Sequence, residues 1–147
     1  MKTRAVISLA IATLLTASLY AADKVNLEKA KCPVSGKECA ADTGVDYKGA
    51  KVYFCCNNCP NTFAKDKAKY AAKANMQLVV TGQAKQVKCP LAGKDLNPAT
   101  KISVDGTDVC FCCNNCKGNV TKMKGDEQIE AVFGDKAFEK GFEVTKK

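Results

Sequence analysis

The longest apolar stretch of the chain lies at its N-terminus. Residues 5–15 follow two basic residues and precede a short run of small residues that ends at Ala22. This order is typical of a secretory signal peptide, with cleavage near Ala21 or Ala22. The stretch is shorter than the ~20 residues that a membrane-spanning helix needs. We therefore predict a signal peptide over residues 1–22, a periplasmic or secreted mature protein, and no permanent membrane anchor.

The remaining apolar and polar positions repeat with a period of 57 residues. CPVSGK from Cys32 recurs as CPLAGK from Cys89, and FCCNNC from Phe54 recurs unchanged from Phe111. A single spacing for every matched pair indicates a duplicated unit rather than chance. The predicted modules are residues 23–84 and 85–147.

Each module shows the same order of predicted elements. The CP-x-x-GK stretch predicts a tight turn, because its glycine tolerates unusual backbone angles. Alternating residues around Lys48-Gly49 and Asp105-Gly106 then predict a β-hairpin in each module. A helix begins at Asn57–Cys59 in the first module, where asparagine suits the cap position and Pro60 the first turn.

The rest of each module predicts a second helix and a closing strand. The second helices are expected over Asp66–Asn75 and Asp126–Phe133, and the closing strands over Gln77–Thr81 and Phe142–Thr145. The predicted fold class is α+β, with two tandem small treble-clef-like modules. The side chains expected to face the core are Phe63, Tyr70, Val120 and Met123.

Composition narrows the chemistry more than it narrows the fold. The formal charge is +8, but after the predicted signal peptide the chain has no arginine, and its lysines alternate with acidic residues. Base recognition and phosphate binding depend heavily on arginine, so we predict no nucleic-acid partner. The chain also contains no histidine. Candidate metal ligands are therefore thiolates, carboxylates, hydroxyls, backbone groups and water.

Three cysteines in each module share one spacing. The first and second are separated by 22 residues, and the second and third by three. The close pair brackets a strand-to-helix turn, where a helix N-terminus favours the thiolate that binds metal. Modules of ~57 residues bury little apolar surface, so a metal or disulfide is expected to stabilise them. The predicted metal ligands are Cys32, Cys55 and Cys59, and Cys89, Cys112 and Cys116.

These motifs resemble the YHS domain. The similarity lies in C-P-[VL]-x-G-K, in the hairpin Tyr47-Lys48-Gly49, in Tyr53-Phe54-Cys55-x-x-x-Cys59 and in Phe63. The cysteine spacing also resembles that of the related TRASH domain, and the resemblance covers nearly all of the chain after the predicted signal peptide. It implies metal binding by the six cysteines, with a role in handling copper or heavy metals. It also implies a metal-transport or other envelope protein as a partner.

The fourth ligand and the metal stay open at the level of sequence. Related treble clefs carry another cysteine where Ser35 and Ala92 stand here. Cys56 and Cys113 are candidate additional or substitute ligands, and water or a carboxylate such as Asp46 could complete a zinc site. Three thiolates without imidazole favour soft or borderline ions. We expect zinc or copper, one ion per module, with cadmium and mercury as further candidates.

Two other interpretations also stay open. An even number of cysteines in an exported protein is typical of structural disulfides. Cys39 and Cys110 have no counterpart in the other module and are the best candidates for a bridge. The C-x-x-C spacing that ends at Cys59 and at Cys116 is also that of a thiol–disulfide redox motif. The favoured hypothesis is a non-enzymatic protein that sequesters, carries or senses metal.

Overall fold

The computed structural model describes residues 25–145. The predicted signal peptide, residues 1–22, lies outside the described residues. Between residues 25 and 145, no helix has both the length and the apolar character that crossing a membrane requires.

The first half of the described chain follows the predicted order of elements. Its hairpin turns at Lys48 and Gly49, which both have positive φ, at 50° and 82°. Asp66 caps the second helix, because its side chain accepts a hydrogen bond from the backbone N–H of Lys69. The elements are β1 (Val45–Tyr47), β2 (Ala50–Val52), α1 (Asn58–Lys65), α2 (Lys67–Val80) and β3 (Ala84–Gln86).

The second half repeats this order with longer strands and one additional helix. Its hairpin turns at Asp105 and Gly106, again with positive φ. The additional helix, α5, was not predicted, and it carries the chain from α4 to the last strand. The elements are β4 (Asn97–Val104), β5 (Thr107–Phe111), α3 (Asn114–Lys122), α4 (Asp126–Phe133), α5 (Asp135–Gly141) and β6 (Phe142–Val144).

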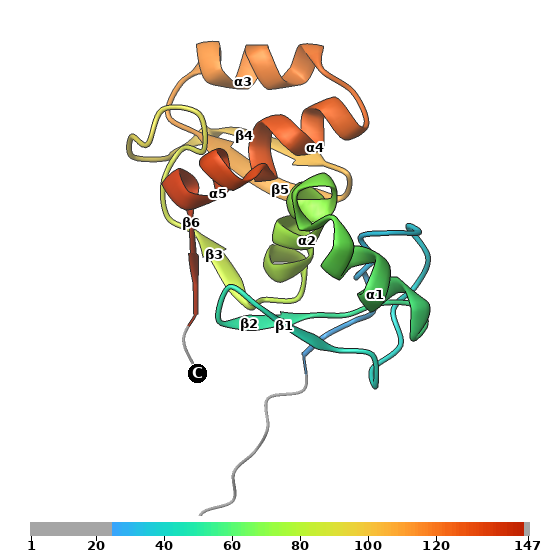
Figure 1. Ribbon diagram of the computed structural model, residues 1–147. Helices are drawn as coiled ribbons and strands as arrows, with labels where there is room; N and C mark the ends of the chain where they lie inside the picture. Colours follow the sequence, from blue (N-terminus) through green and yellow to red (C-terminus); the bar gives the residue numbers. More distant parts are fainter. Residues whose placement is uncertain (1–24, 146–147) are drawn as a thin grey trace, which may run out of the picture.

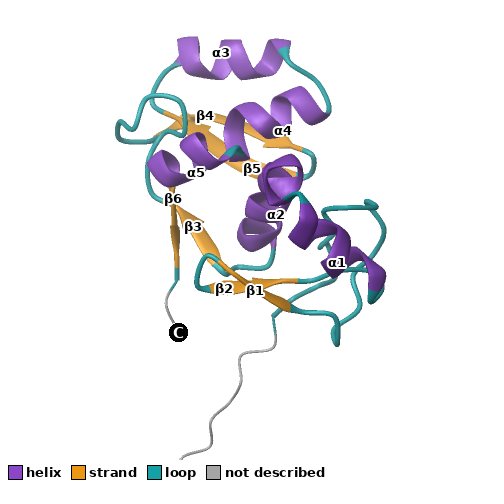
Figure 2. Ribbon diagram, in the orientation of Figure 1, coloured by secondary structure: helices purple, strands orange, loops and turns teal. Residues whose placement is uncertain are grey.

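The two halves pack against each other as one α+β body. The described strands form three two-stranded antiparallel sheets, β1–β2, β4–β5 and β3–β6, and the third sheet pairs the middle of the chain with its end. In Figure 1, β3 and β6 run along one side of the molecule and link its two parts. Helix α2 contacts α4 and lies between the two hairpins (Figure 2). The Asn75 side chain donates a hydrogen bond of 2.8 Å from α2 to the carbonyl oxygen of Phe133.

One predicted strand is wrong. The segment Gln77–Thr81 forms the last turn and the C-cap of α2, and the strand that follows begins only at Ala84. A short apolar run cannot be assigned to strand or helix by periodicity alone. Here the alanine-rich sequence before it continues the helix, and this places Leu78 in the core, fully buried. In the second half the predicted closing strand is confirmed as β6, Phe142–Val144.

The core lies directly behind the strand ends that carry cysteines. Phe54 and Phe111 are fully buried, and the ring of Phe54 lies 5.4 Å from that of Phe63. Phe63 and Val120 are buried as predicted, whereas Tyr70 and Met123 are only half-buried. Since successive side chains of an extended chain point to opposite sides, burying Phe54 and Phe111 turns the next residue, a cysteine, away from the core.

Candidate metal centres

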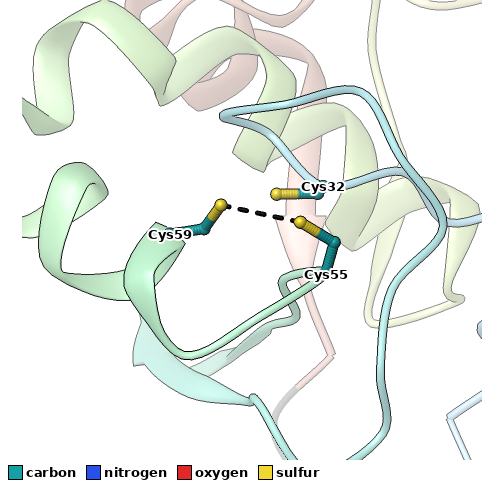
Figure 3. A group of neighbouring side chains, drawn as sticks. All are labelled: Cys32, Cys55 and Cys59. Carbon is teal, nitrogen blue, oxygen red and sulfur yellow. Dashed lines mark hydrogen bonds between the residues drawn. The ribbon is translucent and has the colours of Figure 1, made fainter.

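In the first half, three cysteines from three segments meet. Cys32 comes from the first turn, Cys55 from the chain after β2, and Cys59 from the first turn of α1. Their sulfur atoms all lie within 4.8 Å of one another. Figure 3 shows the three sulfurs turned toward one another, with 3.6 Å between those of Cys55 and Cys59. This group, called site 1 below, could hold a metal ion.

The second half builds an equivalent group, called site 2. The sulfur atoms of Cys89, Cys112 and Cys116 also lie within 4.8 Å of one another. Cys112 is the first residue after β5, and Cys116 lies in the first turn of α3. The structure therefore brings together all six predicted ligands, in two groups of three.

The first turn of each half is built by the same two hydrogen bonds. The backbone N–H of Cys32 donates to the carbonyl of Lys37 at 2.7 Å, and that of Gly36 donates to the carbonyl of Cys32 at 2.8 Å. In the second half the equivalent bonds measure 2.9 and 2.7 Å. Gly36 and Gly93 have φ of 70° and 66°, a region that favours glycine. This tight turn directs the cysteine inward, and Cys32 and Cys89 are buried.

A threonine in each half fixes the strand end before the second cysteine. The hydroxyl oxygen of Thr43 accepts a hydrogen bond from the N–H of Phe54 at 3.1 Å and donates to the carbonyl of Ala40 at 2.8 Å. Thr100 makes the equivalent bonds at 2.8 and 2.6 Å. Sequence reasoning missed both residues. They are separated by the same 57 positions as the cysteines, so the repeat itself carried the signal.

A buried glutamine joins the first turn to the hairpin in site 1. The Gln77 side-chain oxygen accepts from the N–H of Tyr53 at 2.7 Å, and its nitrogen donates to the carbonyl of Tyr53 at 2.8 Å. The same nitrogen donates to the carbonyl of Lys31 at 2.9 Å. Lys31 precedes Cys32, and Tyr53 lies two residues before Cys55. One amide therefore sets the distance between two segments that each carry a cysteine of site 1.

Gln86 performs the same task in site 2. It accepts from the N–H of Cys110 at 2.9 Å and donates to its carbonyl at 2.7 Å. It also lies 3.2 Å from the carbonyl of Lys88, to which it donates. The contacted backbone positions in the two halves are 57 residues apart, but the glutamines are not. Gln77 follows its hairpin on α2, and Gln86 precedes its first turn on β3. The repeat could not have revealed this equivalence.

With this geometry described, the chain can be compared with known proteins. No protein-family model matches it, and neither does any curated protein or solved structure. The two cysteine groups are consistent with the resemblance to YHS and TRASH domains without establishing membership of either family.

The cysteine of each first turn is the most acidic buried thiol of its site. Burial alone would raise the pKa of Cys32, but hydrogen bonds from the Ser35 hydroxyl and from nearby backbone N–H groups lower it to about 7. The pKa of Cys89 is also lowered, because backbone N–H groups, with that of Cys112 first, outweigh its burial. Ser35 marks a difference between the sites. Its hydroxyl oxygen lies 3.1 Å from the Cys55 sulfur, whereas Ala92 at the equivalent position offers no hydroxyl.

The start of each helix acts on different thiols from those predicted. Burial, followed by hydrogen bonds to neighbouring sulfurs, raises the pKa of Cys59, and burial raises that of Cys116 to about 12. The backbone N–H groups at the two helix starts instead lower the pKa of Cys56 and Cys113. These thiols precede the first turn, where unpaired N–H groups point outward. The predicted asparagine cap is wrong, because Asn57 makes no side-chain capping bond.

The other candidate ligands lie outside the two groups. Cys56 is exposed, with its sulfur 3.8 Å from that of Cys55 and 3.6 Å from that of Cys59. Cys113 is also exposed, 3.8 Å from the sulfur of Cys112. Asp46 is exposed on β1 and belongs to neither group.

The two unmatched cysteines are not bridged. All ten cysteines lie within residues 25–145, and all are free thiols. The thiol of Cys39 donates to the carbonyl of Tyr53 at 3.3 Å, and burial raises its pKa to about 12. The nitrogen of Gln77 also lies 3.3 Å from the Cys39 sulfur. Cys39 therefore packs beside the glutamine contact of site 1 rather than in the site.

Proposed function

We propose that this protein binds two thiophilic metal ions, one at each site, and that it is a tandem YHS-like, treble-clef-type protein without enzymatic activity. The observation that carries the proposal is the meeting of three sulfurs from three separate segments, twice, within 4.8 Å. Buried thiols so close together cannot all ionise without a cation between them, since like charges at this distance repel strongly.

The ligand set favours soft or borderline ions. Thiolates select Cu(I) and Zn(II), and they also bind Cd(II) and Hg(II). Structural zinc sites are almost always four-coordinate, so zinc would need a water or a further thiol in addition to the three buried sulfurs. Binding releases the thiol protons and links the first turn, the strand end and the helix start of each half. The ion would therefore stabilise the fold as well as being its cargo.

The sequence context supports an exported carrier or sequestering protein. The N-terminal segment resembles a signal peptide, and the envelope is where metal-transport proteins would exchange ions with such a carrier. In an oxidising compartment, a bound ion would also protect the thiols from disulfide formation. We infer sequestration or trafficking of metal, with an envelope protein as the partner.

Metal analysis combined with thiol counting tests this function. Protein purified under reducing conditions should hold two ions per chain, and its site thiols should react only after a chelator removes the metal. Cys32→Ser and Cys89→Ser should each remove one ion, whereas Cys39→Ser should remove neither. Thiols that appear only after treatment with a reductant, with no ion retained, would instead establish a disulfide-stabilised scaffold.

A second function is favoured by one specific feature. The exposed Cys56, whose pKa is lowered, lies 3.6 Å from the buried Cys59, as an attacking thiol lies near its resolving partner in a redox protein. Turnover of a dithiol substrate, abolished by Cys59→Ala and unaffected by metal removal, would support this function. A lack of turnover in metal-free, fully reduced protein would dismiss it.

A further inference from the structure

Each half carries a fourth sulfur that overlaps its site from the outside. Cys56 approaches two members of site 1, at 3.8 Å from the Cys55 sulfur and 3.6 Å from the Cys59 sulfur. It is not a member of the group that includes Cys32. Two sets of three sulfurs therefore share the Cys55–Cys59 pair, one completed by Cys32 and the other by Cys56.

The two sets differ in their access to solvent. Cys32 is 1% exposed and Cys59 is 8% exposed, so the first set faces the protein interior. Cys56 is exposed on the turn before α1. An ion that moved from the first set to the second would exchange a single sulfur and would move from the interior toward the surface.

The second half repeats this arrangement. Cys89 is fully buried, whereas Cys113 is exposed, with its sulfur 3.8 Å from that of Cys112. The sulfurs of Cys112 and Cys116 are also 3.8 Å apart. The unmatched Cys39 and Cys110 have no such counterparts, so the overlap belongs to the repeated unit and was retained in both halves.

We propose that Cys56 and Cys113 are exchange ligands, through which each ion leaves its buried site for an acceptor protein that presents thiols. This inference rests on the proposed metal-binding function. The acceptor must offer soft sulfur ligands, because harder oxygen or nitrogen ligands compete poorly with three thiolates for a soft ion.

The hand-over balances as a series of ligand substitutions without a redox step. The Cys56 thiol loses its proton as its sulfur binds the ion, and the departing Cys32 sulfur takes up one proton. An acceptor thiol then binds in the same way at the exposed side, and Cys55 and Cys59 depart and are protonated in turn. The ion keeps its oxidation state, and each sulfur bond that breaks is replaced by one that forms.

Transfer kinetics from the full-length mature protein test this route. The chain is loaded with Cd(II), whose thiolate absorption band reports occupancy, and is mixed with a small dithiol as the acceptor. In Cys56→Ser/Cys113→Ser the transfer rate should fall by about tenfold or more, which corresponds to ~1.4 kcal/mol in the exchange barrier. The number of ions bound and their affinities should stay close to those of the unmodified chain. The alanine versions of the two substitutions should behave in the same way.

The matched control is Cys39→Ser/Cys110→Ser, which removes two partly buried thiols outside both sites and should leave the rate unchanged. A transfer rate in Cys56→Ser/Cys113→Ser equal to that of the unmodified chain would overturn the exchange route. A loss of affinity as large as that of Cys55→Ser would overturn it too, by making Cys56 a permanent ligand. If the unmodified chain bound no Cd(II) at all, the proposed function itself would fail.

Discussion

The two halves of the molecule build the same group of sulfurs but hold it in different ways. In the first half, the amide that joins the turn to the hairpin comes from α2, after the hairpin, and Ser35 adds a hydroxyl beside Cys55. In the second half, the amide comes from β3, before the turn, and alanine replaces the serine. Site 2 therefore depends on the strand that pairs the two halves, whereas site 1 depends on its own helix. The comparison indicates that duplication preserved the ligands and rebuilt their support.

Replacing the glutamines should give the largest effects. Gln77→Leu should weaken binding at site 1 alone, and Gln86→Leu at site 2 alone, because each removes the contacts that hold two ligand-bearing segments together. Loss of such supporting partners typically costs about 10–100-fold in metal affinity. Binding is measured in chains with one intact site, using Cys89→Ser to isolate site 1 and Cys32→Ser to isolate site 2.

Gln83 provides the matched control for these two substitutions. It makes the same pair of hydrogen bonds to one backbone position, Lys51, at 2.8 and 2.7 Å, but it contacts neither turn that carries a cysteine. Gln83→Leu should lower the free energy of unfolding by about 1–3 kcal/mol, because it leaves backbone groups unpaired, and should leave both affinities unchanged. Equal losses of affinity in all three variants would show that the glutamines act only through general stability.

Exchanging Ser35 and Ala92 should produce a smaller and opposite pair of effects. Ser35→Ala removes a hydroxyl that lowers the pKa of Cys32, so more protons compete with the ion at site 1. We expect a loss of about 1 kcal/mol in binding, or roughly fivefold. Ala92→Ser should strengthen site 2 by a similar or smaller amount. The two affinities are measured in the same single-site chains.

The pH dependence gives a further check on the serine. The pKa of Cys32 is about 7, so this thiol is ionised above that pH and needs no proton release to bind an ion. Without the hydroxyl its pKa rises, and the loss of affinity in Ser35→Ala should grow as the pH falls toward 7 and shrink in alkaline solution. A loss that is constant across this range would mean that the hydroxyl acts by packing alone.

Local patterns in the sequence predicted the elements that carry the cysteines. The period of 57 residues identified the six thiols, and Lys48-Gly49 and Asp105-Gly106 located the two hairpins. These features depend on neighbouring residues, so a single sequence contains them. The segment Gln77–Thr81 was misassigned because an apolar run of five residues suits a strand and a buried helix equally well.

The contacts that support the sites could not be predicted in this way. Gln77 and Gln86 each bind a backbone position 24 residues away, on opposite sides in the sequence. A hydrogen bond to the backbone places no requirement on the partner's side chain, so it leaves no matching residue to find. The lowered pKa of Cys56 likewise depends on where the helix starts to within one residue, and element boundaries are the least reliable part of sequence-based assignment.

The smallest expected effect concerns the ion pair between the halves. Lys48, at the tip of the first hairpin, contacts Asp135 of α5 at 2.7 Å, and this contact lowers the pKa of Asp135. The two side chains are 28% and 52% exposed, so we expect Asp135→Asn to lower the free energy of unfolding by less than about 1 kcal/mol at neutral pH. A carboxyl group whose pKa is lower in the folded state stabilises the fold above its unfolded-state pKa and stops doing so as the pH falls through the folded value. The difference from the unmodified chain should therefore disappear in acid.

The pair Lys101–Asp108 serves as the control, because it is exposed and lies within the second hairpin alone. Unfolding of Asp135→Asn and Asp108→Asn is followed by denaturant titration of the metal-free protein. Contact between the halves also involves α2, α4 and the β3–β6 sheet, so loss of the Lys48–Asp135 pair should shift a single transition without splitting it. Two separate transitions in Asp135→Asn would contradict this cooperative packing, and they would mean that site 2 keeps its shape without the strand that Gln86 occupies.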